Sequence, residues 1–280
     1  MKKTLTACAV CVVIGHAAVA DVAENKATAI AAMTEVFVGL DLSKIPDYFA
    51  DPYIQHNPMA GSGVAALTVL LEGAKQGPGF GLETARIIGE GDLVAMHNVW
   101  TGFGPAPLVA FDVFRFNEDG KIVEHWDNLA PLEESPNPSG RMQIDGETEI
   151  TDLDRGDPNK AHVVEMITKG FIEGEQIDFT QYISPETYLQ HNTMAGDGLD
   201  GLMAGMQAMA EQGMAMSYSE LPLTLAEGNF VLTGAVGAMG DTPTAFYDLF
   251  RLENGLIVEH WDVIAPIQQD NLPDGYPGKF

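Results

Sequence analysis

The sequence predicts an α+β fold that occurs twice along the chain. Residues 53–61, Tyr-Ile-Gln-His-Asn-Pro-Met-Ala-Gly, return at 188–196 as Tyr-Leu-Gln-His-Asn-Thr-Met-Ala-Gly, which is a displacement of 135 residues. The hexapeptide Ile-Val-Glu-His-Trp-Asp occurs at 122–127 and again, with the same displacement, at 257–262. A repeat of this length is a whole domain. In each copy helical patterns precede strand patterns, as in domains whose helices cover one face of a curved antiparallel sheet.

Helices are expected where apolar residues recur at helical spacing among good helix formers, and Pro158 suits a first helical turn. A short second helix leads into the Gln-His-Asn turn. The expected helices, paired by copy, are 23–37 with 158–171, 45–53 with 179–188, and 63–73 with 199–212. Alternating patterns then predict an antiparallel meander of four strands. These strands are 85–90, 93–100, 110–116 and 122–129 in the first copy, and 217–226, 230–237, 244–252 and 256–264 in the second.

The last hairpin of each copy can be aligned by counting turn residues. Asn254-Gly255 favours a two-residue type I′ loop, and residues 118–120 suit a three-residue loop with Gly120 left-handed. Both loops deliver the same register, which a bulge in either strand would shift by one residue. The predicted cross-strand pairs are Asp112 with Trp126 and Asp248 with Trp261.

Alternation along these strands assigns each side chain to a face. Asp112 shares its face with Phe114 and Phe116, and an aspartate in an apolar row can act as a general base near neutral pH. The predicted register adds Glu124 and Trp126 to that face. It directs His125 and Asp127 to the other face, together with Arg115. His125 and His260, each beside a carboxylate, are expected to tie the sheet together or to stabilise the contact between the two copies.

The first twenty residues have the features of a secretory signal. Lys2 and Lys3 precede an apolar run from Leu5 to Ile14, and Ala18-Val19-Ala20 is a small-residue cleavage site. Both cysteines lie inside this segment, so the mature chain is expected to have neither disulfides nor thiolate metal sites. We expect a signal peptide at 1–20, a first domain at 21–140, a linker at 141–157, a second domain at 158–280, and a periplasmic or secreted location.

The charge balance argues against nucleic-acid partners and against anionic lipid. Removal of the signal would leave twelve basic residues against forty acidic ones, a net charge of −28 with histidine neutral. Such a chain repels polyanions. The acidic residues are scattered and the apolar content is 46%, so we expect a folded protein with a solvated acidic surface and no membrane insertion.

The motifs at 55–58, 112–115 and 120–127 resemble SnoaL-like polyketide cyclases of the nuclear-transport-factor-2-like superfamily. The resemblance covers both copies. It implies two cone-shaped, cystatin-like domains, each with an apolar pocket for a hydrophobic small molecule, arranged as an internal pseudo-dimer. The named cyclases perform intramolecular aldol condensation with neither a metal nor an organic cofactor. A strand aspartate acts as acid and base, and a histidine on the preceding strand stabilises the enolate.

The resemblance maps the catalytic roles onto Asp112 and His97. The second copy keeps Asp248 but has Gly234 where the first has His97. Substrate contacts are expected from further residues of the shared motifs. The expected contacts are Tyr53, His56, Asn57, Phe114 and Trp126 in the first copy, and Tyr188, His191, Asp248 and Trp261 in the second.

Each of these residues also has a structural interpretation. His97 alternates with Leu93 and Ala95 and could be a satisfied core histidine, and His56 and His191 could cap a helix. The methionines of the second copy, among them Met206 and Met209, suit a core or an adaptable pocket wall better than a copper site. Three functions remain open: an acid–base enzyme, a binding module for a hydrophobic small molecule, and a structural repeat whose pockets are filled by side chains.

Overall fold

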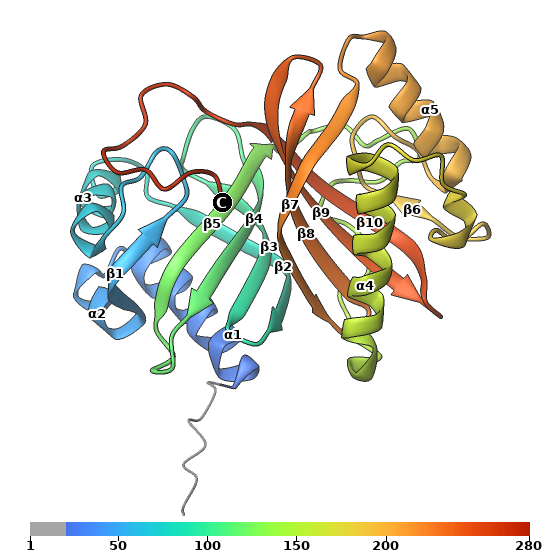
Figure 1. Cartoon of the computed structure of the whole chain (residues 1–280). Helices are drawn as coiled ribbons and strands as arrows, with labels where there is room; N and C mark the ends of the chain where they lie inside the picture. Colours follow the sequence, from blue (N-terminus) through green and yellow to red (C-terminus); the bar gives the residue numbers. More distant parts are fainter. Residues whose placement is uncertain (1–20) are drawn as a thin grey trace, which may run out of the picture.

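The computed structural model describes residues 21–280, so the expected signal peptide lies outside the described residues. Each half of the described chain forms a five-stranded sheet with helices on one side (Figure 1). The predicted α+β class and its duplication are therefore confirmed. We call the two halves domain 1 and domain 2.

Domain 1 follows the predicted order of helices and strands, and it adds a fifth strand at Phe49–Gln55 that was not predicted. Its first helix continues into a wider π-helical turn at Ala32–Val38. The helices are α1 (Val22–Ala31), α2 (Ile45–Tyr48) and α3 (Val64–Ala74). The strands are β1 (Phe49–Gln55), β2 (Gly81–Glu90), β3 (Leu93–Thr101), β4 (Leu108–Phe116) and β5 (Ile122–Pro131).

Domain 2 repeats this arrangement. Its helices are α4 (Gly156–Ile167) and α5 (Gly198–Glu211), and its strands are β6 (Leu189–Gln190), β7 (Met216–Glu227), β8 (Phe230–Met239), β9 (Thr242–Glu253) and β10 (Leu256–Pro266). The expected helix at 179–188 is wrong, because only Phe179–Gln181 is helical, as a 3₁₀ turn. The expected helix at 45–53 is too long, because α2 ends at Tyr48 and Phe49–Gln55 forms β1. In both copies the following residues pair in parallel with the last strand, β1 with β5 and β6 with β10, and this long-range pairing overrides the local pattern.

The predicted register of the last hairpin is wrong by one residue. Both turns form as expected, with Gly120, Asn254 and Gly255 at positive φ. A bulge then inserts Val123 on β5 and Val258 on β10, because Phe116 pairs with Ile122 while Arg115 pairs with Glu124. The observed pairs are Asp112 with Asp127 and Asp248 with Asp262. The bulge moves His125 and Asp127 to the face of Asp112, and moves Trp126 and Glu124 to the opposite face.

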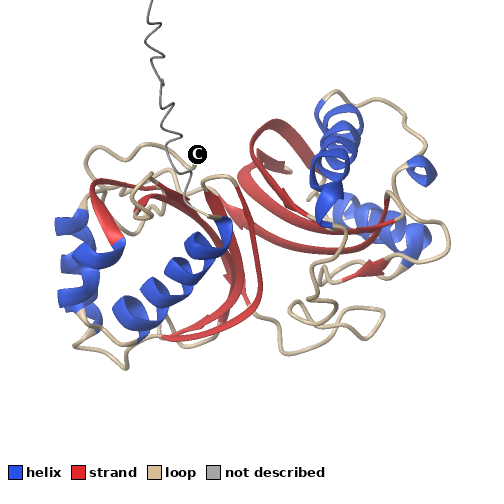
Figure 2. Ribbon diagram, turned by 90° about the horizontal axis from the view of Figure 1, so that it is seen from below, coloured by secondary structure: helices blue, strands red, loops and turns tan. Residues whose placement is uncertain are grey.

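The two sheets pack against each other and carry their helices on the outer sides (Figure 2). A shared apolar core joins side chains of both sheets, including Phe111 and Trp126 of domain 1 and Tyr247 and Trp261 of domain 2. Asn128 adds hydrogen bonds across this interface, since its Nδ2 donates to the carbonyls of Ala245 (3.1 Å) and Val263 (2.6 Å). The two sheets pack in the manner expected of an internal pseudo-dimer.

The contacts at the edge of the interface are reciprocal. Glu227 accepts from the backbone N–H of Gly89, and Glu90 accepts from the backbone N–H of Ala226, at 2.7 and 2.8 Å. Each of these glutamates also forms an ion pair with a lysine of the other domain's first helix, Lys26 with Glu227 and Lys160 with Glu90. The two domains are thus related by an approximate two-fold arrangement.

Two segments cross between the domains, and we call them straps. The linker strap, residues 132–150, follows domain 1 and covers domain 2, where Asn137 Nδ2 donates to the carbonyl of Gln190 at 2.6 Å. The C-terminal strap, residues 267–280, follows domain 2 and covers domain 1 (Figure 1), where the hydroxyl of Tyr276 donates to the carbonyl of His56 at 3.0 Å. The linker strap thus begins before the expected linker at 141–157, and the last residues of the chain pack on domain 1.

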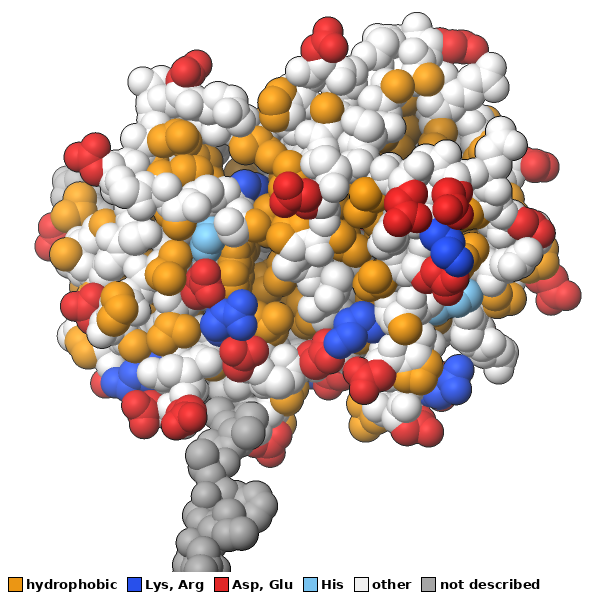
Figure 3. Space-filling model, in the orientation of Figure 1, with side chains coloured by type: hydrophobic (Ala, Val, Ile, Leu, Met, Phe, Trp, Pro, Cys, Tyr) orange, Lys and Arg blue, Asp and Glu red, His pale blue; other side chains and the backbone are white. Residues whose placement is uncertain are grey.

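The surface of the described part of the chain matches the acidic composition. Acidic side chains are spread over the visible face of both domains (Figure 3). Within residues 21–280 none of the helices combines the length and the apolar character that crossing a membrane would require.

We expect Asn128→Ala to lower the free energy of unfolding by about 2–3 kcal/mol, because two buried carbonyls lose their donor. Urea unfolding of the full chain measures this loss. Gln76→Ala, a change at an exposed position, is the control and should stay within about 0.5 kcal/mol of wild type. An equally small effect of Asn128→Ala would show that these interface hydrogen bonds contribute little.

Candidate functional site

Domain 1 contains a cavity between its helices and the concave face of its sheet. The volume is about 380 Å³, which lies within the ~300–1,000 Å³ range of small-molecule pockets. Most of its wall is apolar, with Met33 and Phe37 from the first helix and its extension, Leu70 from α3, and Trp100 and Leu129 from the sheet. Its polar wall residues are Gln55, Asn57, Asp112, His125 and Asp127.

Three of these polar residues form a compact group on the sheet. Asp112 on β4 lies opposite Asp127 on β5, and His125 is two residues before Asp127 on the same face. His125 Nε2 is 3.2 Å from Asp112 Oδ1. Since all three side chains are buried, this group, which we call the triad, places two carboxylates and an imidazole at the wall of an apolar cavity.

The surrounding hydrogen bonds fix the orientation of the His125 ring. Gln55 Oε1 accepts the backbone N–H of Asn57 at 2.9 Å, and Gln55 Nε2 donates to the hydroxyl of Tyr53 at 3.0 Å. The backbone contact identifies this atom as the amide oxygen, so it must also accept from His125 Nδ1, 3.0 Å away. His125 therefore carries a hydrogen on Nδ1 and directs Nε2 at Asp112.

Both carboxylates of the triad accept hydrogen bonds from asparagine side chains through Oδ2. Asp112 Oδ2 accepts from Asn98 Nδ2 at 2.7 Å and from Trp100 Nε1 at 2.8 Å. Asp127 Oδ2 accepts from Asn57 Nδ2 at 2.6 Å. Asp127 Oδ1 is buried and has no hydrogen-bond partner in the described protein. A buried carboxylate oxygen without a donor is a reactive acceptor, which is the property that a general base requires.

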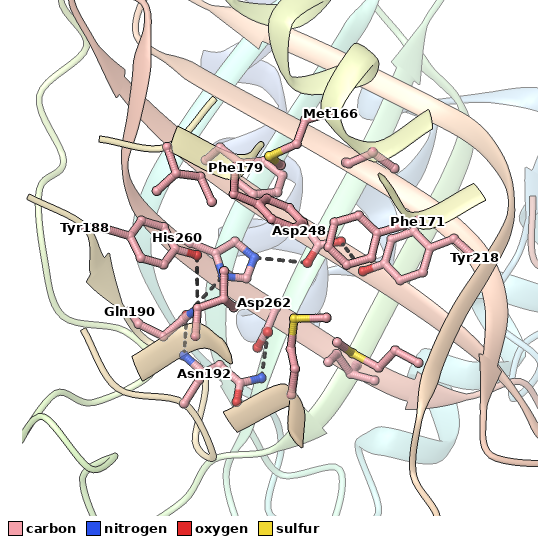
Figure 4. Close-up of a pocket in the computed structure, with 18 of the residues that line it drawn as sticks. Met166, Phe171, Phe179, Tyr188, Gln190, Asn192, Tyr218, Asp248, His260 and Asp262 are labelled. Carbon is pink, nitrogen blue, oxygen red and sulfur yellow. Dashed lines mark hydrogen bonds and ion pairs between the residues drawn. The ribbon is translucent and has the colours of Figure 1, made fainter. Parts of the chain in front are cut away.

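Domain 2 repeats the triad as Asp248, His260 and Asp262 (Figure 4). His260 Nε2 is 3.0 Å from Asp248 Oδ1, and its Nδ1 is 2.9 Å from Gln190 Oε1. Asn192 Nδ2 donates to Asp262 Oδ2 at 2.7 Å, as Asn57 does to Asp127. One partner differs, because the hydroxyl of Tyr218, instead of an asparagine and a tryptophan, donates to Asp248 Oδ2 at 3.0 Å.

Burial and charge shift the titration of this second triad. Burial raises the pKa of Asp262 to about 6, and the nearby carboxylate of Asp248 acts in the same direction, whereas His260 and the hydrogen bond from Asn192 oppose it. Burial alone would lower the pKa of His260, but its hydrogen bond to Asp248 and the charges of Asp262 and Asp248 outweigh burial and raise that pKa. Asp262 and His260 therefore take up protons more readily in the folded chain than in the unfolded one.

The structure does not bring His97 to Asp112. Met96 is the residue of β3 directly opposite Asp112, so His97 lies on the other face, with its ring stacked on Phe111 and its Nδ1 3.2 Å from Arg86 Nη1. Burial lowers the pKa of His97 well below its usual value, and the charge of Arg86 adds to this effect. His97 and its counterpart Gly234 thus belong to the interface between the domains.

The residues expected to contact substrate lie in three places: at the cavity walls, behind the site residues, and at the interface between the domains. Asn57, Tyr188 and Asp248 line the cavities, while Phe114 stacks behind His125 and Tyr53 supports Gln55. The expectation that Trp126 and Trp261 form pocket walls is wrong, because the bulge directs them to the interface. There they stack on His56 and His191, whose Nδ1 atoms contact carbonyls of the straps.

The sequence prediction identified the first aspartate of each triad and missed the histidine and the second aspartate. It placed His125, Asp127 and His260 away from the chemistry, and it gave Gln55, Asn98 and Trp100 no role. The repeated Gln-His-Asn and His-Trp-Asp motifs contained the signal, because Gln55 and Asn57 contact His125 and Asp127 directly. Without the position of the bulge, alternation assigned these side chains to the wrong face.

The triads are also the groups of the described chain that could hold a metal ion. One oxygen or nitrogen from each of Asp112, His125 and Asp127 lies within 4.8 Å of the others, and the same is true of Asp248, His260 and Asp262. Carboxylate and imidazole ligands whose other atoms are hydrogen-bonded would suit a divalent cation.

Comparison with known families identifies the first repeat. Residues 30–125 match the family model of the SnoaL-like domain. Domain 1 is therefore a SnoaL-like domain, and domain 2 repeats its fold and its triad. The family match thus covers residues 30–125 alone, and the likeness of domain 2 to domain 1 rests on its matching sheet order and its matching triad.

Solved structures with similarity to this chain include enzymes and candidate enzymes. AclR, a putative hydroxylase from Streptomyces galilaeus, is 28% identical, with a TM-score of 0.33, and the match covers 39% of this chain and 91% of AclR. IdmH, a putative polyketide cyclase from Streptomyces antibioticus, is 22% identical, with a TM-score of 0.31 and coverage of 38% and 91%. An epoxide hydrolase from M. tuberculosis is 19% identical, with a TM-score of 0.35 and coverage of 39% and 84%. Comparison with curated protein sequences gives no match.

We expect acidification to stabilise the fold through Asp262. Its pKa is raised in the folded chain, so its contribution is present below its unfolded pKa of about 4 and is lost as the pH rises through about 6. Between pH 7.5 and pH 5 this group should add about 1 kcal/mol to the free energy of unfolding. Urea titrations of wild type and Asp262→Asn at the two pH values measure it.

The Asp262→Asn protein should show a pH increment about 1 kcal/mol smaller than that of wild type. Asp119→Asn, in an exposed turn, is the control and should keep the wild-type increment. Equal increments in wild type and Asp262→Asn would contradict the raised pKa.

Proposed function

We propose that domain 1 is an acid–base catalyst that acts on a small, largely apolar carbonyl compound through its own side chains. The observation that carries this proposal concerns Asp127, a residue that lines an apolar cavity of about 380 Å³ and whose carboxylate oxygen Oδ1 is buried without a donor. The neighbouring Asp112–His125 pair supplies a group that can hold and return a proton. SnoaL-like domains include polyketide cyclases, and that membership supports the same class of reaction.

In the proposed reaction Asp127 Oδ1 takes the proton from the carbon next to the carbonyl group. The electron pair of that C–H bond moves to the carbonyl oxygen, and the proton shared between His125 Nε2 and Asp112 Oδ1 is directed to the resulting enolate oxygen and stabilises it. The enolate carbon then attacks a second carbonyl carbon in an aldol ring closure, or it is protonated at another position in an isomerisation. The proton held by Asp127 returns to the product in either case. The apolar walls exclude water from the enolate.

We also propose that the mature protein works in the periplasm or is secreted. Support comes from the paired lysines, apolar run and small-residue site of residues 1–20. Export also favours the alternative function, which is binding of a hydrophobic small molecule without chemistry, because polyketide assembly normally takes place inside the cell.

Hydrogen exchange at carbon tests for catalysis without knowledge of the natural substrate. Incubation of 4-phenylbutan-2-one with the protein in D₂O should replace the protons next to the carbonyl group, and ¹H NMR follows the loss of their signal. We expect Asp127→Asn to lower the exchange rate at least ~100-fold, because general acid–base groups contribute about 10²–10⁴-fold. A pure binding domain would take up the ketone and leave its exchange rate at that of the buffer.

His97→Gln and Asp119→Asn serve as controls and should keep the exchange rate of the folded protein within about two-fold of wild type. Neither residue lines the cavity of domain 1. Exchange that survives in Asp127→Asn and disappears in His97→Gln would overturn the assignment. Exchange that is abolished by EDTA and restored by Mn²⁺ or Zn²⁺ would instead identify the triad as a metal site.

A further inference from the structure

Domain 2 borders two chambers that meet at Asp262, and Ala130 and Pro131 of β5 in domain 1 also line one of them. One chamber of about 60 Å³ lies between the helices and the sheet of domain 2, and a second of about 240 Å³ lies beneath the linker strap. Asn192, Met209, Asp262 and Ile264 line both chambers, so these residues form the wall between them. In domain 1 the counterparts of three of them, Asn57, Asp127 and Leu129, line one undivided cavity.

Met209 of α5 is the one of these four residues whose counterpart does not line the cavity of domain 1. That counterpart, at the 135-residue displacement, is Ala74, the last residue of α3. A long thioether side chain therefore lies between the chambers of domain 2 where domain 1 has a methyl group. Because methionine is unbranched and adapts its shape readily, this wall can yield to a ligand.

The chambers have different chemistry. The inner chamber is lined mainly by apolar and aromatic side chains such as Phe171 and Met206, and it reaches Asp248 and His260 (Figure 4). The outer chamber has more polar walls, including Thr193 of domain 2 and Glu133 and Gln143 of the linker strap. Asp262 stands where the two meet.

The size and charge of the chambers limit what can bind. An apolar cavity of roughly 150 Å³ holds benzene, so the inner chamber alone accepts only a short apolar group, whereas the outer one accepts a ring or a polar chain of that size. Both chambers contain carboxylates, and none of the lysines or arginines of residues 21–280 lines either of them. An anionic ligand in the outer chamber would therefore meet the carboxylates of Glu133 and Asp262 with neither a lysine nor an arginine beside it.

We propose that domain 2 carries a second ligand site, distinct from the cavity of domain 1, for a small organic amine or alcohol with a short apolar end. The ligand lies in the outer chamber beneath the linker strap, with its hydroxyl or ammonium group at Asp262. Its apolar end displaces Met209 toward the inner chamber. The two domains of one chain thus bind different molecules.

Methionine methyl groups report on the two sites separately. Met206, Met209 and Met216 line the chambers of domain 2, whereas Met33 and Met59 line the cavity of domain 1. The full-length mature protein, labelled with ¹³C at its methionine methyl groups, is titrated with three probes of similar size: benzylamine, benzyl alcohol and benzoate. We expect saturable shifts of the domain 2 methyl signals with the amine and the alcohol, and at least ten-fold weaker binding of benzoate.

Two variants separate the contributions of charge and volume. Asp262→Asn should weaken benzylamine binding at least ten-fold and change benzyl alcohol binding less than three-fold. Met209→Ala should join the chambers and strengthen binding of the longer 3-phenylpropan-1-ol at least five-fold. Absence of saturable shifts at the domain 2 methyl groups in wild type, or binding of benzoate as tight as that of benzylamine, would overturn the proposal. Neither result bears on ketone exchange in domain 1.

Discussion

The bulge at Val123, repeated at Val258, is the constraint on which the site depends. A β-strand directs successive side chains to opposite faces, so one inserted residue exchanges the two sets. In domain 1 the exchange places His125 and Asp127 beneath the helices. It places Trp126 and Glu124 on the face that meets the other sheet, and β10 repeats the pattern. Without the bulge, Asp112 would face a tryptophan and the cavity would lack its unpaired carboxylate oxygen.

The same exchange builds the interface. Trp126 and Trp261, on the face opposite the triads, belong to the apolar core shared by the two sheets. Arg86 lies over the ring of Trp261 with 4.1 Å between its guanidinium carbon and the ring centroid, and donates to the carbonyls of Asp145 and Glu147 of the linker strap. Burial lowers the pKa of Arg86 to about 10, so it remains charged at neutral pH. Catalytic geometry and domain pairing thus result from one backbone irregularity.

The sequence was sufficient for the features that depend on local chemistry. Helical spacing located α1, α3, α4 and α5, and the turn residues at Gly120 and Asn254-Gly255 adopted the conformations that their chemistry favours. The failures required information from distant parts of the chain. Residues 49–55 became a strand because they pair with β5, and His97 faces the interface because Met96 is the residue opposite Asp112. The bulges at Val123 and Val258 contain no turn-forming residue that would mark them in the sequence. Alternation alone therefore could not place the triad side chains on one face.

The reciprocal straps give the duplication a topological consequence. The segment that follows each domain covers the other one, so the carbonyl that contacts His191 comes from Met142 and the carbonyl that contacts His56 comes from Gly278. A cut after residue 150 would therefore leave each half without the strap that covers it. Because the C-terminal strap is encoded last, the cover of domain 1 can be added only after the sequence of domain 2 has been synthesised.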